Sequence, residues 1–337
     1  MKNIQVSIIV PTFRRPEILK ETLGVLTNLD FPKDAYEIIV VDDGSADSTS
    51  EVVKDFQKKL PRLTYHFQEN SGVAKARNEG VRVAQGDVLI FNDDDILIEP
   101  DNIRKHLRHL SEFGNCLVCG HWEFTPELEE SMKSTQFGRF RMAMENWYKR
   151  ENKKDLIRGT CYQSQTISPQ NASVRRKDFW HIGGFDEDFP YAGCEDHEFV
   201  LRSIKAGYKF IYDYDIRLLN NDRRIDIEQF GERNRRGAVT KVLIAHKFPD
   251  EEASHPMIIE NGFVKLGEPL KRTAKKVVKK IMATSSVSTL LLGLTRFLEK
   301  NWKNSFLLTR LYTISCGIYI FRGIREGINR YGEPQKK

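Results

Sequence analysis

The sequence predicts an α/β protein with a mostly parallel sheet flanked by helices, followed by a C-terminal helical appendage. Over the first hundred residues, apolar runs of strand length alternate with segments of helical periodicity. Two of these runs end in clustered aspartates, and beyond about residue 222 helical patterns replace the strands. A chain of 337 residues can bury one large core and still carry an appendage. We therefore expect one domain over residues 1–225 and the appendage over residues 226–337.

Four short apolar runs rich in β-branched residues predict the first four strands. They are VSIIVP at residues 6–11, YEIIVVDD at 36–43, the alternating Leu63, Tyr65 and Phe67, and DVLIF at 87–91. Helices fit between them, because Pro16 suits a first helical position, residues 44–49 favour a helix start, and Gly86 ends the third helix. Strands that alternate with helices predict a parallel sheet covered on both faces.

The middle of the chain is less regular. Residues 127–152 are rich in charged side chains and place four apolar side chains near helical spacing, which indicates a helix or a mobile excursion: Phe137, Phe140, Met144 and Trp147. Further on, Glu195 and Asp196 begin a predicted helix that ends at Gly207. The helix dipole favours acids in a first turn, so these two residues fit a plain helix start as well as a functional site.

The composition of the chain limits its expected cellular location and binding partners. The net charge of +6 and the pI of about 8.9 favour anionic partners such as nucleotides or lipid headgroups, and no nucleic acid partner is expected. Cys116 and Cys119 lie in a predicted strand without a second cysteine pair, so we interpret them as core residues in a reducing compartment. The N-terminus has too short an apolar run for a signal peptide, so we expect a cytoplasmic protein.

Aspartates gather where two predicted strands end. Asp42 and Asp43 close the second strand, and Asp93, Asp94 and Asp95 close the fourth. Because parallel strands end at one edge of a sheet, both clusters should face the same crevice. Adjacent carboxylates repel, and a hard divalent cation is a natural counterion. A turn with an N-cap is the alternative for residues 42–45. The chain lacks both GxGxxG after the first strand and the P-loop pattern, which argues against dinucleotide and P-loop enzymes.

Five ordered blocks make residues 4–222 similar to the inverting family 2 glycosyltransferases, which have the GT-A fold. The blocks are VSIIVPTFRRP, IIVVDDGSADST, NSGVAKARNEG, FNDDDILIEPD and GGFDEDFPYAGCEDHEF. The resemblance implies a nucleotide-sugar half over residues 1–120 and an acceptor half over residues 121–225.

The resemblance also implies a role for each matching residue. The nucleotide would be held by Pro11, Thr12, Arg14, Asp42, Asp43, Gly72, Arg77, Asn78, Asp93 and Asp94. Asp93 and Asp95 would be the D-x-D pair that binds Mg²⁺ or Mn²⁺, and Asp186 and Glu187 would shape the acceptor side. Asp196 would be the catalytic base, with Glu195 beside it.

The implied function is metal-dependent, inverting transfer of a sugar from a UDP- or dTDP-linked donor. The acceptor would be a hydroxyl of a glycan or of a lipid-linked molecule, as in cell-envelope polysaccharide synthesis. Two alternatives are a nucleotide-sugar-binding protein without transfer and a nucleotidyltransferase, although the first loop, PTFRRPEIL, lacks the glycines expected of the latter. Asn220 and Asn221 stand where many relatives have a metal-binding histidine, so the ion would have more water ligands.

The C-terminal appendage contains a basic amphipathic helix. Residues 271–280 carry six basic residues and no acid, and the basic face from Arg272 to Lys280 indicates a surface for anionic membranes and a peripheral position at the inner face of the cell membrane. A helix packed on the domain is the alternative. The apolar stretch at residues 306–321 is shorter than the ~20 residues that a membrane-spanning helix needs.

Overall fold

The computed structural model describes residues 4–151, 157, 159–164, 168–252, 255–301 and 305–335. They form two compact units, one built from Met1–Thr125 and Lys153–Asp222 and the other from Pro126–Asn152 and Arg223–Lys337. The division expected from the sequence lies after residue 225. The structure differs chiefly in grouping residues 126–152 with the C-terminal unit.

The first unit is built on a single mixed sheet. Its strands are β1 (Val6–Thr12), β2 (Tyr36–Asp42), β3 (Leu63–Phe67), β4 (Val88–Asn92), β5 (Ile96–Ile98), β6 (Cys116–Phe124), β7 (Cys161–Ser164), β8 (Asn171–Arg175) and β9 (Lys209–Asn220). Within the described ranges their order is β3-β2-β1-β4-β8-β6-β9-β5, and β7 pairs with β9. Strands β1, β2, β3, β4, β6 and β9 run in one direction and the others run against them, which confirms the predicted mostly parallel sheet.

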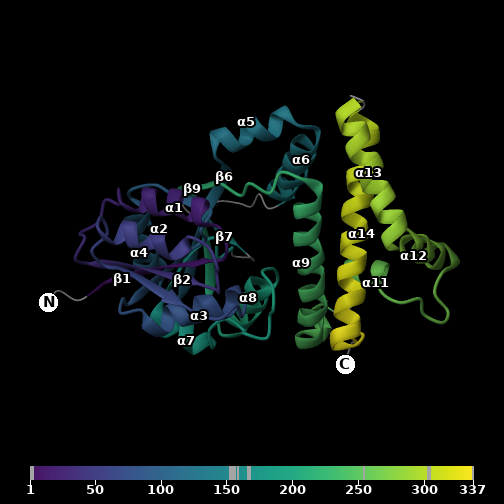
Figure 1. The fold of residues 1–337 in the computed structure, drawn as a ribbon. Coiled ribbons are helices and arrows are strands. Elements are labelled where there is room, and N and C mark those ends of the chain that lie inside the picture. Colours follow the sequence, from purple (N-terminus) through teal and green to yellow (C-terminus); the bar gives the residue numbers. More distant parts are fainter. Residues whose placement is uncertain are drawn as a thin grey trace. The chain divides into compact units, whose positions relative to one another are not determined.

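Helices cover both faces of this sheet, as expected (Figure 1). They are α1 (Pro16–Leu26), α2 (Thr49–Gln57), α3 (Val73–Val83), α4 (Asn102–Phe113), α7 (Arg176–Ile182) and α8 (Glu195–Lys205). Successive side chains of β1 point to opposite faces. Ile8 belongs to a core with α1, α2 and α4, whereas Ile9 belongs to a core with α3, α7 and α8. Cys116 and Cys119 are buried in these cores, as predicted.

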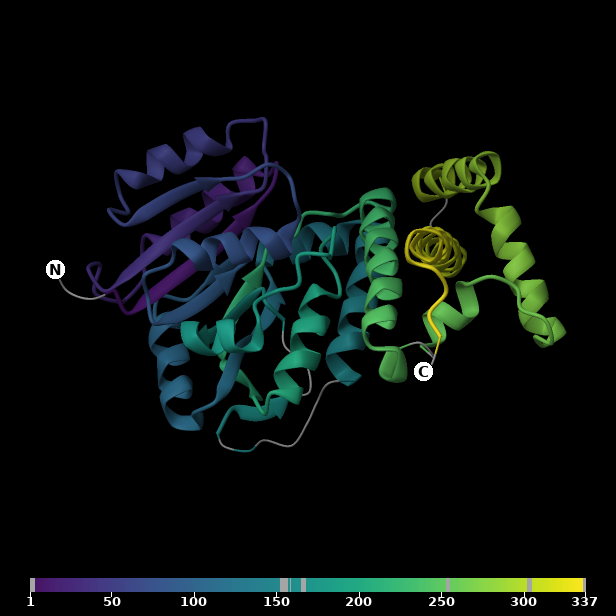
Figure 2. The ribbon, with the colours of Figure 1, turned by 90° about the horizontal axis from the view of Figure 1, so that it is seen from below.

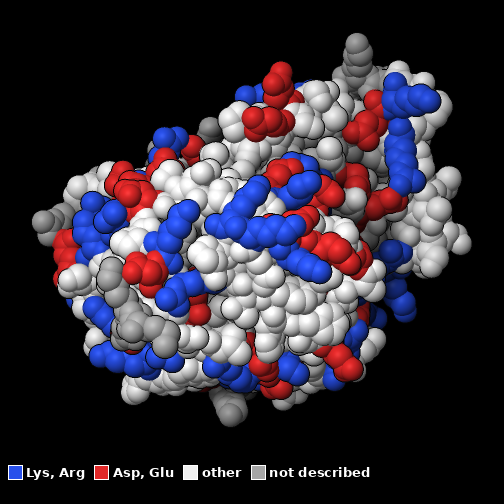
Figure 3. All heavy atoms as spheres, turned by 60° about the vertical axis from the view of Figure 1, so that its left-hand side comes forward, with Lys and Arg blue, Asp and Glu red and all other residues white. Residues whose placement is uncertain are grey.

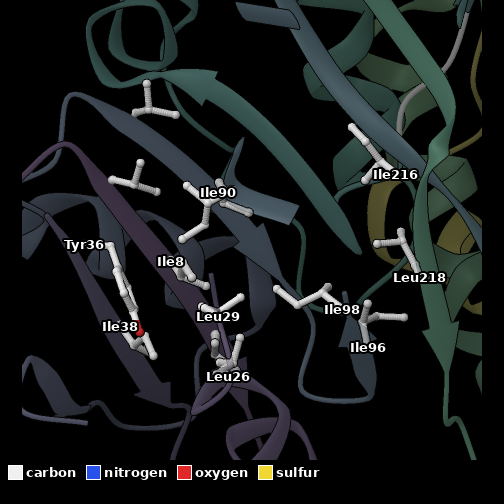
Figure 4. Close-up of a cluster of buried hydrophobic side chains, with 14 of the residues drawn as sticks. Ile8, Leu26, Leu29, Tyr36, Ile38, Ile90, Ile96, Ile98, Ile216 and Leu218 are labelled. Atoms are coloured by element: carbon white, nitrogen blue, oxygen red, sulfur yellow. The ribbon is translucent and has the colours of Figure 1, made fainter. Parts of the chain in front are cut away.

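The first of these cores holds the strands in register. Figure 4 shows Ile8, Ile38 and Ile90 from three neighbouring strands, with Leu26 of α1 packed among them. Each such side chain stabilises the fold by about 1.5–3 kcal/mol relative to an exposed position. The parallel register brings Thr12 level with Asp42 at the carboxyl ends of β1 and β2. The core therefore fixes which loops meet at that edge of the sheet.

The second unit is helical. It contains α5 (Pro126–Ser134), α6 (Gln136–Glu151), α9 (Ile227–Lys247), α10 (Pro249–Glu252), α11 (Pro256–Asn261), α12 (Leu270–Met282), α13 (Ser285–Asn301) and α14 (Ser305–Tyr331). Phe137 and Phe140 of α6 share a core with Phe230 of α9 and Tyr312 of α14, which explains why residues 126–152 belong here. The side chain of Trp147, placed on this helix by the sequence, lies outside the described residues.

Helix α14 lies between α9 and the α12–α13 pair (Figures 1 and 2). No single described helix is both long and apolar enough to cross a membrane. Helices α12 and α13 together reach the required length and hydropathy, but they are bent by 79° at their junction. On the face shown in Figure 3, basic and acidic side chains are interspersed, so the excess positive charge does not form one continuous surface there.

Candidate active site

The loops after β1 and β2 meet through hydrogen bonds. Pro11 and Thr12 are buried at the end of β1, and the backbone N–H of Arg14, which has a φ of 53°, donates to Ser45 Oγ at 2.7 Å. Asp42 accepts hydrogen bonds from Ser45 N at 2.8 Å and from the Tyr65 hydroxyl at 2.6 Å. The predicted nucleotide-binding residues of these two loops therefore lie side by side.

Asp43 is the anchor of the loop between β3 and α3. One of its carboxylate oxygens accepts from Gln68 Nε2 and Ser71 N, both at 2.7 Å. The other accepts from Asn70 Nδ2 at 3.2 Å and from Gly72 N at 2.9 Å. Four donors fill the usual accepting capacity of a carboxylate. A contact between Asp43 and the base of a nucleotide stays a prediction. In the structure, Asp43 positions Gly72, where φ is 96°.

The three consecutive aspartates form a tight turn after β4. Ile96 N donates to the Asp93 carbonyl at 3.1 Å, and Asn92 Nδ2 donates to the carbonyls of Asp93 and Ile96 at 3.0 Å. Asn92 is held in turn by Asn171 Nδ2, which donates to its side-chain oxygen at 2.9 Å. Buried amides therefore hold the backbone of the carboxylate cluster.

Arg15 neutralises two of these carboxylates. Its guanidinium lies 2.9 Å from Asp94 Oδ1 and 2.5 Å from Asp95 Oδ2, and Thr12 Oγ1 donates to Asp94 at 2.8 Å. Burial raises the pKa of Asp94 well above its usual range; Arg15 opposes the rise, and Asp95 adds to it. The cation between these carboxylates in the structure is thus a side chain of the protein itself.

Arg77 joins the third aspartate to the start of α8. Its guanidinium donates to Asp93 at 2.8 Å and to Glu195 at 2.9 Å, and it is almost completely buried. Burial raises the pKa of Glu195 and the adjacent Asp196 adds to the rise, whereas Arg77 opposes it. One arginine therefore connects the predicted metal-binding turn with the predicted catalytic helix. Arg77 and Glu195 are 118 residues apart in the sequence.

Asn78 has a structural position in this arrangement. Its amide donates to the Phe185 carbonyl and to Glu187, both at 2.8 Å, and its oxygen accepts from Phe185 N at 2.9 Å. Glu187 also pairs with Arg82 at 2.7 Å. Asp186 accepts from Asp188 N at 3.0 Å. Asn78 and Glu187 thus hold the loop that carries Asp186, on the predicted acceptor side.

The two acids at the start of α8 differ in accessibility. Glu195 is buried, and its oxygens are engaged by Arg77 and by Gly193 N at 2.6 Å. Asp196 is half-buried, accepts from His197 N at 2.8 Å, and lines a small apolar pocket with Phe91, Phe185 and Phe199. Of the two, Asp196 is the more accessible.

The end of β9 reaches the aspartate turn. Asn221 N donates to the Asp95 carbonyl at 2.8 Å, and its side chain donates to Glu21 at 2.6 Å. Asn220 accepts from Asp222 N at 2.9 Å. Burial acts to lower the pKa of Arg15, but the carboxylates of Asp94, Asp95 and Asp222 raise it overall. A buried acid, Asp222, therefore directly follows the position expected for a histidine and adds to the negative charge around Arg15.

Sequence reasoning missed three residues of this site: Arg15, Asn92 and Asp222. Arg15 adjoins the first predicted loop, but its carboxylate partners lie about eighty residues away. Asn92 ends a strand run and precedes the acids, a position that suits a turn-forming amide. Asp222 directly follows Asn220 and Asn221, which stand where a metal-binding histidine was expected. The need for a third oxygen ligand of the metal was the signal that could have pointed to Asp222.

A second cluster of potential ligand atoms lies elsewhere in the first unit. His109, Cys161 and Asp213 are buried together, on α4, β7 and β9. His109 Nε2 is 2.5 Å from Asp213 Oδ2, and Cys161 Sγ is 3.8 and 3.9 Å from the two ring nitrogens. An ion between the nitrogen and the oxygen needs about 2 Å to each atom, so the 2.5 Å separation is that of a hydrogen bond. We interpret this cluster as a structural polar contact.

Comparison with known proteins identifies the family. The model of glycosyl transferase family 2 matches residues 7–183, which is more than half of the chain. Validoxylamine A glucosyltransferase from Streptomyces hygroscopicus subsp. limoneus is 30% identical over 257 residues, which cover 71% of this chain and 54% of that protein. The chain thus spans about half the length of this curated relative.

Solved structures show the same fold. The mannosyltransferase PcManGT from Pyrobaculum calidifontis, in complex with GDP-Man and Mn²⁺, matches with a TM-score of 0.56 at 17% identity, over 96% of this chain and 88% of that one. Residues 1–349 of S. aureus TarS, in complex with UDP, match with a TM-score of 0.50 at 20% identity, over 97% and 92% of the two chains. Together with the family match, these likenesses show that the chain has the GT-A fold and belongs to family 2 of the glycosyltransferases.

Proposed function

We propose that this chain transfers a sugar, with inversion, from a nucleoside diphosphate sugar to an acceptor hydroxyl in a metal-dependent reaction. The observation that carries the proposal is the pair of ion bridges made by Arg77. They bring the aspartate turn after β4 close to the acids that begin α8, which supports a single site. A donor diphosphate on the turn would then lie beside a carboxylate able to accept a proton.

Asp93 and Asp95 are the residues proposed to hold the metal. Their donor set fits Mg²⁺ or Mn²⁺, because hard divalent cations prefer carboxylate oxygens. Asp222 is the further oxygen donor at the adjoining strand end. The bound ion would supply charge stabilisation to the departing diphosphate. The PcManGT structure with GDP-Man and Mn²⁺ supports a divalent metal in this fold.

The nucleotide is proposed to lie over the loops after β1, β2 and β3. Asp43 fixes the β3–α3 loop, and Thr12 and Arg14 after β1 meet the loop after β2, where Asp43 N donates to the Thr12 carbonyl and Arg14 N to Ser45 Oγ. We propose a UDP- or dTDP-linked donor, and the TarS structure that contains UDP supports the former. The exposed guanidinium of Arg14 is suited to an anionic phosphate.

Asp196 is the proposed general base. The acceptor hydroxyl loses its proton to this carboxylate as its oxygen attacks the anomeric carbon, and the bond to the diphosphate breaks on the opposite face. The anomeric centre is therefore inverted. Such a base typically contributes ~10²–10⁴-fold to the rate. Glu195, which is engaged by Arg77 and Gly193, instead orients the start of the helix. The acceptor is proposed to be a glycan or lipid-linked molecule of the cell envelope, presented at an anionic membrane surface.

The test is a donor panel with and without metal. Purified protein is mixed with UDP-, dTDP- and GDP-linked sugars, with Mn²⁺ or with EDTA, and thermal stability and nucleotide release are measured. A correct donor at about a hundred times its dissociation constant should stabilise the protein by ~2.7 kcal/mol with Mn²⁺ and should be hydrolysed slowly. NMR of a transferred product then reports the anomeric configuration.

Three outcomes would contradict the proposal. Full turnover in EDTA would show that the reaction does not depend on a metal ion. Retention of the anomeric configuration would exclude direct displacement at the anomeric carbon. Metal-dependent binding without any hydrolysis or transfer, for every donor and acceptor tried, would favour a nucleotide-sugar-binding protein. Release of pyrophosphate from a nucleoside triphosphate would indicate a nucleotidyltransferase.

A further inference from the structure

The basic helix α12 turns much of its positive charge toward the protein. Lys276 is buried and donates to Glu268 at 2.6 Å and to the Phe263 carbonyl at 2.9 Å. On the same side, Arg272 pairs with Glu260 at 3.0 Å and Lys279 donates to Asn261 at 2.8 Å. Three of the basic residues expected to meet a membrane are therefore engaged within the second unit.

The opposite side of α12 is apolar and faces outward. Leu270, Val277, Val278 and Ile281 recur at intervals of about one or two helical turns, and each is between 47% and 87% exposed. Such a stripe normally faces a core, because each exposed side chain forgoes about 1.5–3 kcal/mol of burial. The outward orientation of this stripe suggests that an apolar partner covers it when the protein is active.

Helix α13 repeats this arrangement. Leu298 packs into the helical core with Leu308 and Tyr312 of α14. A second stripe on α13 is exposed: Val287, Leu290, Leu294 and Phe297. Both helices lie on the side of α14 away from α9 (Figures 1 and 2). The two stripes thus belong to one bent helix pair of membrane-like hydropathy.

The charge of the pair indicates what covers it. Residues 270–301 contain eight lysines and arginines and one acid, Glu299. Lys271 and Lys280 flank the α12 stripe on its two sides and, with Lys275, have no ion pair among the described residues. Two copies meeting through this face would bring like charges together, whereas anionic headgroups would neutralise them.

We propose that α12 and α13 lie in the headgroup layer of an anionic bilayer and insert their two apolar stripes toward the acyl chains. Lys271 and Lys280 extend from the flanks of the stripe to the lipid phosphates, as long basic side chains do at interfaces. This sharpens the membrane part of the proposed function by assigning the contact to the apolar side of the helices. It does not depend on the sugar chemistry.

The test is co-sedimentation of the full chain with vesicles of phosphatidylglycerol or of phosphatidylcholine. A Val278→Glu, Leu290→Glu, Phe297→Glu variant changes only exposed positions and should lower the partition coefficient on the anionic vesicles at least ~10-fold. Val83→Glu, on an exposed apolar position of α3, is the matched control and should bind as wild type does. Circular dichroism checks that all variants are folded.

A lysine variant separates insertion from simple attraction. Lys271→Gln, Lys275→Gln, Lys280→Gln should weaken binding at low salt and have little effect at high salt, where charge is screened. Wild-type protein that stays monodisperse and ignores anionic vesicles would overturn the proposal. So would a wild-type dimer that the glutamate variant converts to a monomer, because a second copy would then be the partner. Donor hydrolysis in vesicle-free buffer tests the proposed catalytic function separately.

Discussion

The strands β2 and β4 both end in buried aspartates, but the two ends balance their charge differently. Asp43, after β2, accepts four hydrogen bonds from neutral amide groups of residues 68–72. Asp94 and Asp95, after β4, are balanced by the guanidinium of Arg15, and Asp93 by that of Arg77. Asp43 is fixed by the loop that it organises, and the other carboxylates are paired with arginine side chains from distant positions in the sequence.

The difference distinguishes an acid whose accepting positions are filled by neutral donors from acids that are paired with cations. Neutral N–H donors that fill the accepting capacity of a carboxylate leave it little to offer a ligand. A carboxylate balanced by an arginine still demands a cation, and a metal ion can replace the guanidinium at little net electrostatic cost. The β4 end is therefore the one suited to reversible metal binding. The following predictions test this contrast, beginning with the largest effect.

Asp95→Ala should abolish metal-dependent activity. The variant loses an oxygen ligand and the partner of Arg15, so transfer should fall ~10³-fold or more, and Mn²⁺-dependent nucleotide binding should disappear. Because Asp94 still pairs with Arg15 and no longer has Asp95 as a like-charged neighbour, the free energy of unfolding should fall less than in Asp43→Ala. Turnover assays, calorimetry and urea unfolding measure the three quantities.

The matched control for that experiment is Asp55→Ala, an exposed acid on α2 that pairs with Lys58. It should leave activity and nucleotide binding unchanged. Wild-type turnover in Asp95→Ala would contradict the assignment of the metal to the β4 end, and the other acids of the site would then need testing in turn.

Asp196→Asn should lower turnover by ~10²-fold or more and leave donor affinity nearly unchanged. The amide keeps the shape of the carboxylate but accepts a proton poorly. Glu195→Gln is the informative neighbour, because it weakens the bridge through Arg77 and should perturb stability as well as turnover. If Asp196→Asn retains activity within a few-fold, the base is another group and Asp186 becomes the next candidate.

Asp43→Ala should show the opposite profile to Asp95→Ala. Four donors lose their acceptor, so the free energy of unfolding should fall by about 2 kcal/mol even without metal. Metal affinity measured without nucleotide should stay at its wild-type value. Urea unfolding and Mn²⁺ titration provide the two readouts. Equal losses of stability in Asp43→Ala and Asp95→Ala would remove the contrast between the two strand ends.

The sequence could predict the elements of this site better than the contacts among them. Strand periodicity located β1 to β4, and acids at two strand ends marked the edge of the sheet where the loops after β1, β2 and β4 meet, because both signals are local. Arg15 escaped notice because its partners are 79 and 80 residues away in the chain and only the folded sheet brings them together. For the same reason, the amphipathic pattern of α12 was clear, whereas the inward orientation of its basic side required Glu260 and Glu268, which lie outside the helix.

Arg15→Met gives the smallest and most discriminating effect. If the guanidinium occupies the carboxylates whenever metal is absent, it competes with the ion and lowers the apparent metal affinity by the fraction of protein that is open. Removing it should raise the affinity for Mn²⁺, measured by calorimetry without nucleotide, by about tenfold, which corresponds to nine-tenths occupancy by Arg15. The same change leaves Asp94 and Asp95 unbalanced, so the metal-free variant should unfold at a lower temperature and recover when Mn²⁺ is added. Lys20→Met, on the exposed side of α1, is the control and should alter neither quantity. A weaker affinity for Mn²⁺ in Arg15→Met would mean that Arg15 assists metal binding rather than competing with the ion. The carboxylates after β4 would then be as fixed as Asp43 after β2.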